Sequence, residues 1–274
     1  EEVQDMRLRF PAGRLDGFTG TGTLQPIPGG LQWIPGGPYA HLTYHAQIDH
    51  VRGQHDRYDS YAGTNWIVTR ARDLFPRSTI NCQPEEGVKS RARLIFRLPS
   101  GWHSAAALTA VAPNTYRLTD PGKMLDRPHG WFALGQFAFE HQEIAGTMVQ
   151  VARAPGSGLQ PPELFHFLDG TLPALKKLLN AEPETVLMVS APDPMWHGGI
   201  SGDRSLFIHA DRPLRTPDKT SPYLHELFHV LQPYKPAADA DWIEEGLAEF
   251  YSLELQRRAG LIDAAAYTRG LGYF

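Results

Sequence analysis

The segment HELFH, residues 225–229, is the part of this 274-residue sequence that decides the fold, and EEGLAEF follows it at residues 244–250. On an α-helix, residues four apart differ by about 40° around the axis and by about 6 Å along it. The imidazoles of His225 and His229 therefore project side by side and can bind one metal ion. The spacing predicts a zinc-binding pair on a helix.

Glu226 directly follows the first of these histidines. One position along a helix turns a side chain by about 100°, which keeps the carboxylate near the ion without making it a ligand. Zinc lowers the pKa of a bound water to about 7 and polarises a substrate carbonyl, and a nearby carboxylate can take the proton of that water. We therefore predict Glu226 as the catalytic general base and Zn²⁺ as the cofactor.

A catalytic zinc site needs a third protein ligand and an open fourth position. The second motif supplies Glu245 and Glu249, another pair four residues apart, and both carboxylates can face the first helix. We assign Glu245 as the third ligand. Glu249 is expected behind it, where it accepts the free ring N–H of a ligating histidine and fixes its orientation.

Capping signals place both motifs on helices. Ser221 can cap the first helix and Pro222 suits its first position, and this helix is expected to end near Gln232, before a proline. The second helix is expected to start at Asp241, whose side chain caps it while Glu244 reaches back to form a capping box.

The motif could also be accidental, on an ordinary amphipathic helix. The glutamates would then form a solvated face, and the core would be contacted by an apolar stripe: Leu224, Leu227, Phe228, Val230 and Leu231. The agreement between two separate motifs favours the metal site over this alternative.

The first half of the chain is rich in strand patterns. Gly- and Pro-rich turns separate short runs of alternating polar and apolar residues, which indicate a β-sandwich. These runs include HLTYHAQIDHV (41–51), NWIVTRARDLF (65–75), RARLIFRLP (91–99) and TMVQVARA (147–154).

The pattern changes after a linker-like stretch, APGSGLQPP. Residues 162–180 have helical spacing, residues 184–192 and 204–210 have strand patterns, and the two motif helices follow. We predict an α+β fold, with a β-sandwich domain at residues 1–153 and a catalytic domain at residues 154–274.

Composition excludes several classes of partner. A formal net charge of −4 and a pI near 6.3 provide no basic field for nucleic acid, and no run of Lys or Arg acts locally instead. No segment approaches about 18 consecutive apolar residues, so no membrane-spanning helix is expected. The single cysteine, Cys82, cannot form an internal disulfide. The chain begins at Glu1, which fits either a removed signal peptide or an arbitrary boundary, and we expect a periplasmic or secreted location.

Other histidines offer further candidate sites. Four of them recur every four or five positions, namely His41, His45, His50 and His55. On a strand, residues four apart are separated by about 13 Å, so we expect solvent-facing side chains and no second metal site there. His197 and His209 flank the strand beside the expected cleft and are candidates for substrate contact.

The motifs together resemble a known family. HELFH followed by WIEEGLAEFYSLEL (242–255) is similar to the pattern of the glycyl aminopeptidase family of gluzincin zinc metallopeptidases. Weaker similarities lie in YRLTDPGKMLDRPHGWFALGQF (116–137) and HGGISGDRSLFIHA (197–210). The resemblance implies an amino-terminal β domain, then a thermolysin-like catalytic domain in which His225, His229 and Glu245 bind zinc and Glu226 is the base.

The sequence departs from that family at the motif that binds the substrate's amino group. Where the family reads Gly-Gly-Leu-Glu-His, this chain has Gly198, Gly199, Ile200, Ser201 and Gly202. The glutamate that grips a free amino group is thus replaced by Ser201. We expect Gly198, Gly199 and Ser201 to contact the substrate.

A second departure concerns the oxyanion. The family carries a tyrosine for this role well after the second helix, so we expect a catalytic domain cut short at its carboxyl end, or an internal substitute. The candidates for a substitute are Tyr223, Tyr251, Tyr267 and His197.

Two functions follow from these residues. The first is zinc-dependent hydrolysis of peptide bonds in a peptide or protein substrate, aminopeptidase-like, with the substrate backbone against an edge strand near SLFIHA (205–210). The second is a peptide-binding or scaffold protein that keeps the fold without turnover. The altered Gly-Gly motif favours the scaffold, whereas Glu226 favours the enzyme, because a structural zinc site needs no base. Side-chain preference, exo- or endopeptidase action and oligomeric state are left open.

Overall fold

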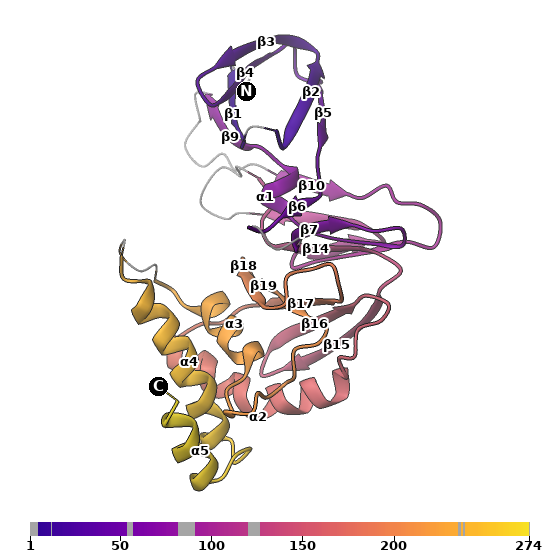
Figure 1. Ribbon diagram of the computed structural model, residues 1–274. Coiled ribbons are helices and arrows are strands. Elements are labelled where there is room, and N and C mark those ends of the chain that lie inside the picture. Colours follow the sequence, from indigo (N-terminus) through magenta and orange to yellow (C-terminus); the bar gives the residue numbers. More distant parts are fainter. Residues whose placement is uncertain are drawn as a thin grey trace.

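The computed structural model describes residues 5–11, 13–53, 57–81, 91–119, 127–234, 237 and 239–273 (Figure 1). Its strands are β1 (Asp5–Arg9), β2 (Leu15–Gly20), β3 (Gly22–Ile27), β4 (Gly30–Pro35), β5 (Leu42–Ala46), β6 (His50–Val51), β7 (Tyr58–Ala62), β8 (Trp66–Arg70), β9 (Arg77–Asn81), β10 (Arg91–Ile95), β11 (His103–Ala106), β12 (Thr109–Ala112), β13 (Thr115–Thr119), β14 (Trp131–Gly135), β15 (Ala138–Ile144), β16 (Thr147–Arg153), β17 (Thr185–Ala191), β18 (Gly199–Gly202) and β19 (Ser205–His209). Its helices are α1 (Ala71–Leu74), α2 (Pro161–Leu179), α3 (Pro222–Leu231), α4 (Asp241–Arg258) and α5 (Ala264–Leu271).

The described part of the chain mixes many strands in several sheets with few helices, and the long helices all follow β16. The strands before β15 are divided among four sheets, with the orders β3-β4-β1-β9, β2-β5, β10-β13-β12 and β11-β14-β8-β7-β6. Figure 1 shows the first two sheets at the end of the molecule opposite the helices, with the other two between. The predicted sandwich is thus distributed over more sheets than two.

A fifth sheet carries the candidate site. Its order is β15-β16-β17-β19-β18, with β16, β17 and β19 parallel and both edge strands antiparallel to their neighbours. The placement of residues 147–154 among the strands of the first half was wrong, because β16 is hydrogen-bonded to β17 in parallel register, with Met148 opposite Thr185. Alternation predicts a strand but not its partner. The division into domains at residue 153 stays a prediction, and this sheet takes strands from both sides of it.

Helix α2 confirms the helical spacing predicted for residues 162–180. It starts with Pro161 at its first position and ends at Asn180, which adopts a left-handed φ of 50°. One face of the helix is buried in the largest hydrophobic cluster, which it shares with strands of the fifth sheet and with α3. The residues of this face recur at helical spacing: Leu164, Leu168, Leu172, Leu175 and Leu179. No helix of the described residues is long and apolar enough to cross a bilayer.

Helices α3 and α4 confirm the two motif helices, with one correction. Ser221 caps α3 as predicted, accepting a hydrogen bond from the backbone N–H of Leu224 at 3.4 Å, and the helix ends before Gln232. Asp241 does not cap α4; Ala240 holds that position without a side-chain hydrogen bond. The predicted capping box fails because Glu244 is bonded to α3 instead. Asp263 caps a further helix, α5, which the sequence analysis did not predict.

Trp131 joins the strands of the first half to the fifth sheet. Its side chain is fully buried, and its indole Nε1–H donates to the carbonyl oxygen of Ile200 at 3.1 Å. Its backbone N–H donates to Ser205 Oγ at 2.9 Å. A Cβ on Gly202 would lie 3.0 Å from the indole, so β18 passes close over the ring. Trp131 therefore fixes the edge strand β18 in position.

We predict that Trp131→Phe lowers the free energy of unfolding by about 2–4 kcal/mol. The change leaves the partly buried carbonyl of Ile200 without the indole donor and opens a cavity at a fully buried side chain. Urea denaturation monitored by circular dichroism measures the effect. The matched control is Trp242→Phe on α4, where the side chain is 75% exposed and the change should stay within about 0.5 kcal/mol. Equal stability of both variants would contradict the role of Trp131.

Candidate metal centre

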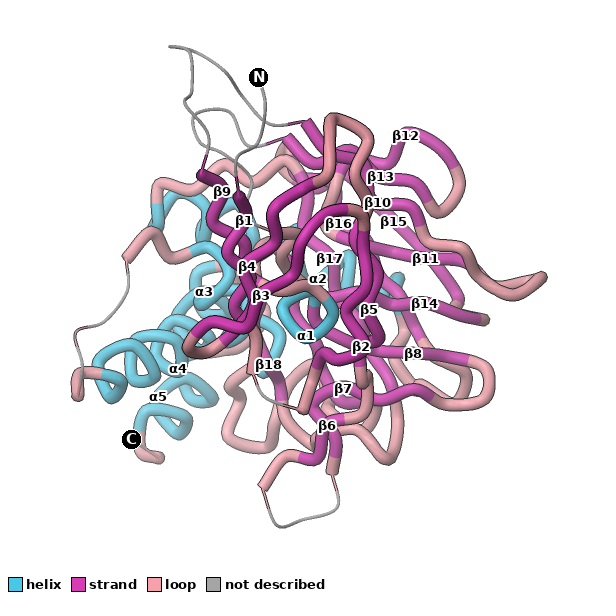
Figure 2. The backbone as a smooth tube through the Cα atoms, turned by 90° about the horizontal axis from the view of Figure 1, so that it is seen from above, coloured by secondary structure: helices cyan, strands magenta, loops and turns pink. Residues whose placement is uncertain are grey.

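Three predicted ligand atoms converge where α3 faces α4. The Nε2 atoms of His225 and His229 lie 3.1 Å apart, and Glu245 Oε2 lies 3.1 Å from the first and 3.6 Å from the second. Four tetrahedral ligands at about 2.0–2.1 Å from zinc are separated from one another by about 3.4 Å. The three atoms thus fit a single zinc ion. Figures 1 and 2 show the two helices side by side.

The other ring nitrogen of each histidine is held by a carboxylate of α4. His225 Nδ1 lies 2.9 Å from Glu249 Oε2, the contact predicted for Glu249, and His229 Nδ1 lies 3.0 Å from Glu244 Oε1. A carboxylate acceptor at Nδ1 places the proton there and leaves the Nε2 lone pair available for a metal. Sequence reasoning missed this contact of Glu244 because it assigned the residue to the helix cap. The sequence did contain a signal for this contact, because a second acidic residue, Glu244, directly precedes Glu245.

The cluster attracts positive charge. Burial disfavours the protonated form of His225, but the hydrogen bond to Glu249 and the charges of Glu226, Glu249 and Glu245 outweigh it, so its pKa is raised. The side chain of Glu245 is 61% exposed, so this side of the cluster is open to solvent. The geometry and the charge both suit a divalent cation with a free coordination position.

Glu226 lies beside this cluster and contacts β18. Burial raises its pKa to about 7, against the opposing effect of His225 and with a smaller contribution from Glu245, and the backbone N–H of Ser201 donates to its carboxylate. A Cβ on Gly199 would lie 2.4 Å from Glu226 Oε1, so a side chain at residue 199 is incompatible with this position. A pKa near neutrality suits a group that accepts and returns protons.

The residues expected to contact substrate lie at this edge of the sheet. Gly199 and Ser201 are on β18, which pairs on one side with β19 and is the last strand of the sheet. A Cβ on Gly198 would lie 2.3 Å from Trp196 Nε1, which makes glycine necessary there as well. The structure therefore gives both glycines a packing role, Gly199 against Glu226 and Gly198 against Trp196, and substrate contact stays a prediction.

A second polar cluster lies next to these residues. His197 Nε2 is 2.7 Å from Asp193 Oδ1, and the buried His209 has its Nε2 3.7 Å from the same oxygen, with no hydrogen-bond partner in the described structure. Arg57 also pairs with Asp193. The hydrogen bond of His197 lowers the pKa of Asp193, whereas burial lowers the pKa of His209. Sequence reasoning did not find Asp193, although Asp193 and His197 are four residues apart.

The histidines of the first half do not come together. His41 contacts Thr21 at 2.9 Å, His45 pairs with Asp16 at 3.5 Å and His50 pairs with Asp59 at 3.4 Å, each through Nδ1. These three histidines thus contact different partners, and the absence of a second metal site stays a prediction. His55 and Cys82 lie outside the described residues.

The candidate oxyanion donors are placed differently from one another. Tyr223 is buried in the hydrophobic core, and the ring of Tyr251 stacks on Phe228 with centroids 5.7 Å apart. Tyr267 packs against the guanidinium of Arg257, and His197 is bonded to Asp193. Within the described structure, none of the four has a recorded hydrogen bond to the three candidate ligands.

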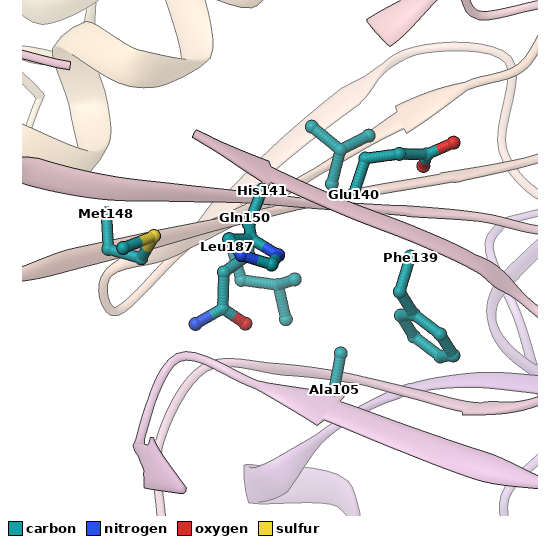
Figure 3. Close-up of a pocket in the computed structure, with 8 residues that line it drawn as sticks. Ala105, Phe139, Glu140, His141, Met148, Gln150 and Leu187 are labelled. Carbon is teal, nitrogen blue, oxygen red and sulfur yellow. The ribbon is translucent and has the colours of Figure 1, made fainter. Parts of the chain in front are cut away.

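Two cavities differ in their relation to this centre. A cavity of about 310 Å³ between β15–β16 and β11 contains none of its residues (Figure 3). A cleft of about 1840 Å³ is bordered by His229, Ser201 and Gly202, so it reaches the candidate centre.

Comparison with solved structures shows the fold of zinc metallopeptidases. No protein-family model and no curated protein sequence matches the chain. An aminopeptidase N family protein from Idiomarina loihiensis aligns over 97% of this chain and 52% of its own, with 13% identity and a TM-score of 0.67. The M1 zinc metallopeptidase from Deinococcus radiodurans aligns over 95% and 64%, with 13% identity and a TM-score of 0.55. Legionella pneumophila aminopeptidase A aligns over 94% and 34%, with 11% identity and a TM-score of 0.54. The chain thus spans about half the length of the first of these proteins.

We predict that Glu226→Gln changes the pH dependence of stability in the metal-free protein. A raised carboxyl pKa means that the folded state binds more protons than the unfolded state between pH 4.5 and about 7, so the stability that Glu226 contributes falls as pH rises through this window. The variant should therefore become about 2–3 kcal/mol more stable relative to the parent at pH 8 than at pH 4.5.

Urea denaturation in EDTA at the two pH values measures this difference. Glu163→Gln, at an exposed position of α2, is the control and should show a constant difference. A constant difference for Glu226→Gln as well would contradict the raised pKa.

Proposed function

We propose that this chain is the zinc-binding part of a metallopeptidase that hydrolyses peptide bonds. The observation that carries the proposal is the convergence of His225 Nε2, His229 Nε2 and Glu245 Oε2, with the buried carboxylate of Glu226 beside them. The fold shared with zinc metallopeptidases supports it. Fold alone does not define an activity, so the proposal rests on the residues.

Each residue has a chemical role in this proposal. His225, His229 and Glu245 would hold Zn²⁺, which supplies Lewis acidity toward a carbonyl oxygen and toward water when bound. Glu226 accepts the proton of the attacking water and returns it to the leaving amine, for which a pKa near 7 is suitable. Glu249 and Glu244 keep both imidazoles in the orientation that presents Nε2.

The substrate backbone has an open edge to pair with. The edge strand expected near residues 205–210 is β18, which pairs with the internal strand β19. An extended peptide can add to β18 by main-chain hydrogen bonds, which would place its carbonyl near Glu226. The residues that fix β18, above all Trp131, would then also position the substrate.

A peptide-binding protein without turnover is the alternative. The serine at position 201 favours it, since the family that the motifs resemble carries a glutamate there. The burial of Glu226 argues against it, because burying a carboxylate is costly and a binding surface does not need one.

We predict that Glu226→Gln lowers kcat for a quenched peptide by a factor of about 10²–10⁴ while zinc binding is retained. Glutamine keeps the size of the side chain but cannot accept the proton of water. Turnover and zinc content by mass spectrometry are measured together, with Glu163→Gln as the control. Equal rates in the parent and in Glu226→Gln would eliminate the enzymatic proposal.

We predict that the enzyme does not require a free amino terminus. Ser201 offers no negative charge to a substrate ammonium group, and a charged hydrogen bond contributes at least about tenfold. Acetylated and free peptides of one sequence should therefore differ by less than about tenfold in kcat/KM. A larger preference for the free amine would show that another carboxylate replaces the missing glutamate.

A further inference from the structure

The cleft that reaches the candidate centre is lined by arginines. Seven of its residues are arginines, compared with two acidic residues, Glu184 and Asp203. This concentration contrasts with the net charge of −4 for the whole chain. The arginines come from α1, β8, β10, β13, the β18–β19 turn and the segment before β14: Arg70, Arg72, Arg91, Arg93, Arg117, Arg127 and Arg204. The sequence has no run of basic residues that predicts this surface, because the arginines come from segments that are distant in sequence.

One of the seven arginines, Arg70, forms ion pairs within the fold. Arg70 is hydrogen-bonded to Asp59 at 3.1 Å and to Asp73 at 3.2 Å. For the other six, no ion pair with an acidic side chain is recorded within the described ranges. Within the described residues, no direct ion pair therefore neutralises these six arginines, although the charges of Asp73 and Asp59 act on Arg72.

Two of these arginines lie directly opposite each other. Arg93 of β10 pairs in antiparallel register with Arg117 of β13, and both are exposed. Like charges at directly opposed positions destabilise a sheet, so this pair does not serve the stability of the three-stranded sheet. A bound anion between the two guanidinium groups would remove the repulsion.

Arg72 and Arg127 form a second pair of interacting arginines at the same cleft. Burial lowers the pKa of Arg72, and the charges of Arg70 and Arg127 lower it further, although Asp73 and Asp59 oppose this. Arg127 Nε is buried and has no hydrogen-bond partner in the described structure. Buried donors are normally satisfied, so an acceptor supplied by a ligand is expected here.

We propose that this arginine-lined cleft binds acidic peptide segments, which makes peptides with Asp or Glu residues near the scissile bond the substrate class of this chain. The inference rests on the proposed peptidase function, because the cleft shares Ser201 and His229 with the candidate centre. A guanidinium group binds a carboxylate with two parallel hydrogen bonds. A positive cleft on a negatively charged chain also steers acidic segments toward the centre.

The test separates binding from turnover. A fluorescein-labelled triglutamate peptide and its triglutamine equivalent are titrated with the metal-free chain, and Kd is obtained from anisotropy. We expect triglutamate to bind at least about tenfold more tightly, with the preference lost at an ionic strength of about 1 M, where the Debye length falls to about 3 Å. The double variant Arg93→Gln, Arg117→Gln should weaken triglutamate binding by at least about tenfold and leave triglutamine binding unchanged.

The control is Arg7→Gln, Arg9→Gln, which removes two exposed charges from β1, outside the cleft. Equal binding of the two peptides, an equal loss in the control, or tighter binding of a labelled oligothymidylate would overturn the proposal. Hydrolysis by the zinc-loaded chain is measured separately on a neutral peptide. Selective binding of triglutamate without any hydrolysis would contradict the peptidase function and support the acidic-peptide site. Hydrolysis without selective binding would support the peptidase function and contradict the acidic-peptide site.

Discussion

The structure depends on two imidazoles whose Nε2 atoms are held 3.1 Å apart while their Nδ1 atoms are bonded to carboxylates of another helix. Two lone pairs aimed at each other repel unless a proton or a metal ion lies between them. The nearby carboxylates make positive charge favourable at that point, which is why the pKa of His225 is raised despite burial. The packing of α3 on α4 thus brings the two Nε2 atoms and the carboxylate of Glu245 within reach of one cation.

The position of this helix pair follows from the core beneath it. The apolar face of α3, including Leu224, Leu227 and Phe228, packs in the same cluster as α2 and the parallel strands. On its other side, Glu226 contacts β18 across Gly199, and β18 is fixed by the hydrogen bond of Trp131. The strands of the first half therefore help to position Glu226 through one buried indole.

Much of the candidate site could be predicted because its geometry is local. Four-residue spacing on a helix places His225 beside His229 in any tertiary context, and Ser221 with Pro222 marks the start of that helix. The contact of Glu244 with His229 depends instead on how α4 lies against α3, and the sheet membership of β16 depends on a partner strand 37 residues further along, from Met148 to Thr185. The arginine-lined cleft depends on five or more separate segments. Long-range packing of this kind leaves no short pattern in the sequence.

The acidic residues around the candidate metal centre and the arginines of the cleft lie on different elements of the fold. A zinc ion held by His225, His229 and Glu245 would give the centre a formal charge of +1. Arg93 and Arg117 lie on β10 and β13, away from α3 and α4, so they can change without altering the helix pair. Solved structures share this fold at 11–13% identity, and the fold alone does not define a substrate. Under the proposed function, substrate preference would depend on the cleft, and hydrolysis would depend on the residues of α3 and α4.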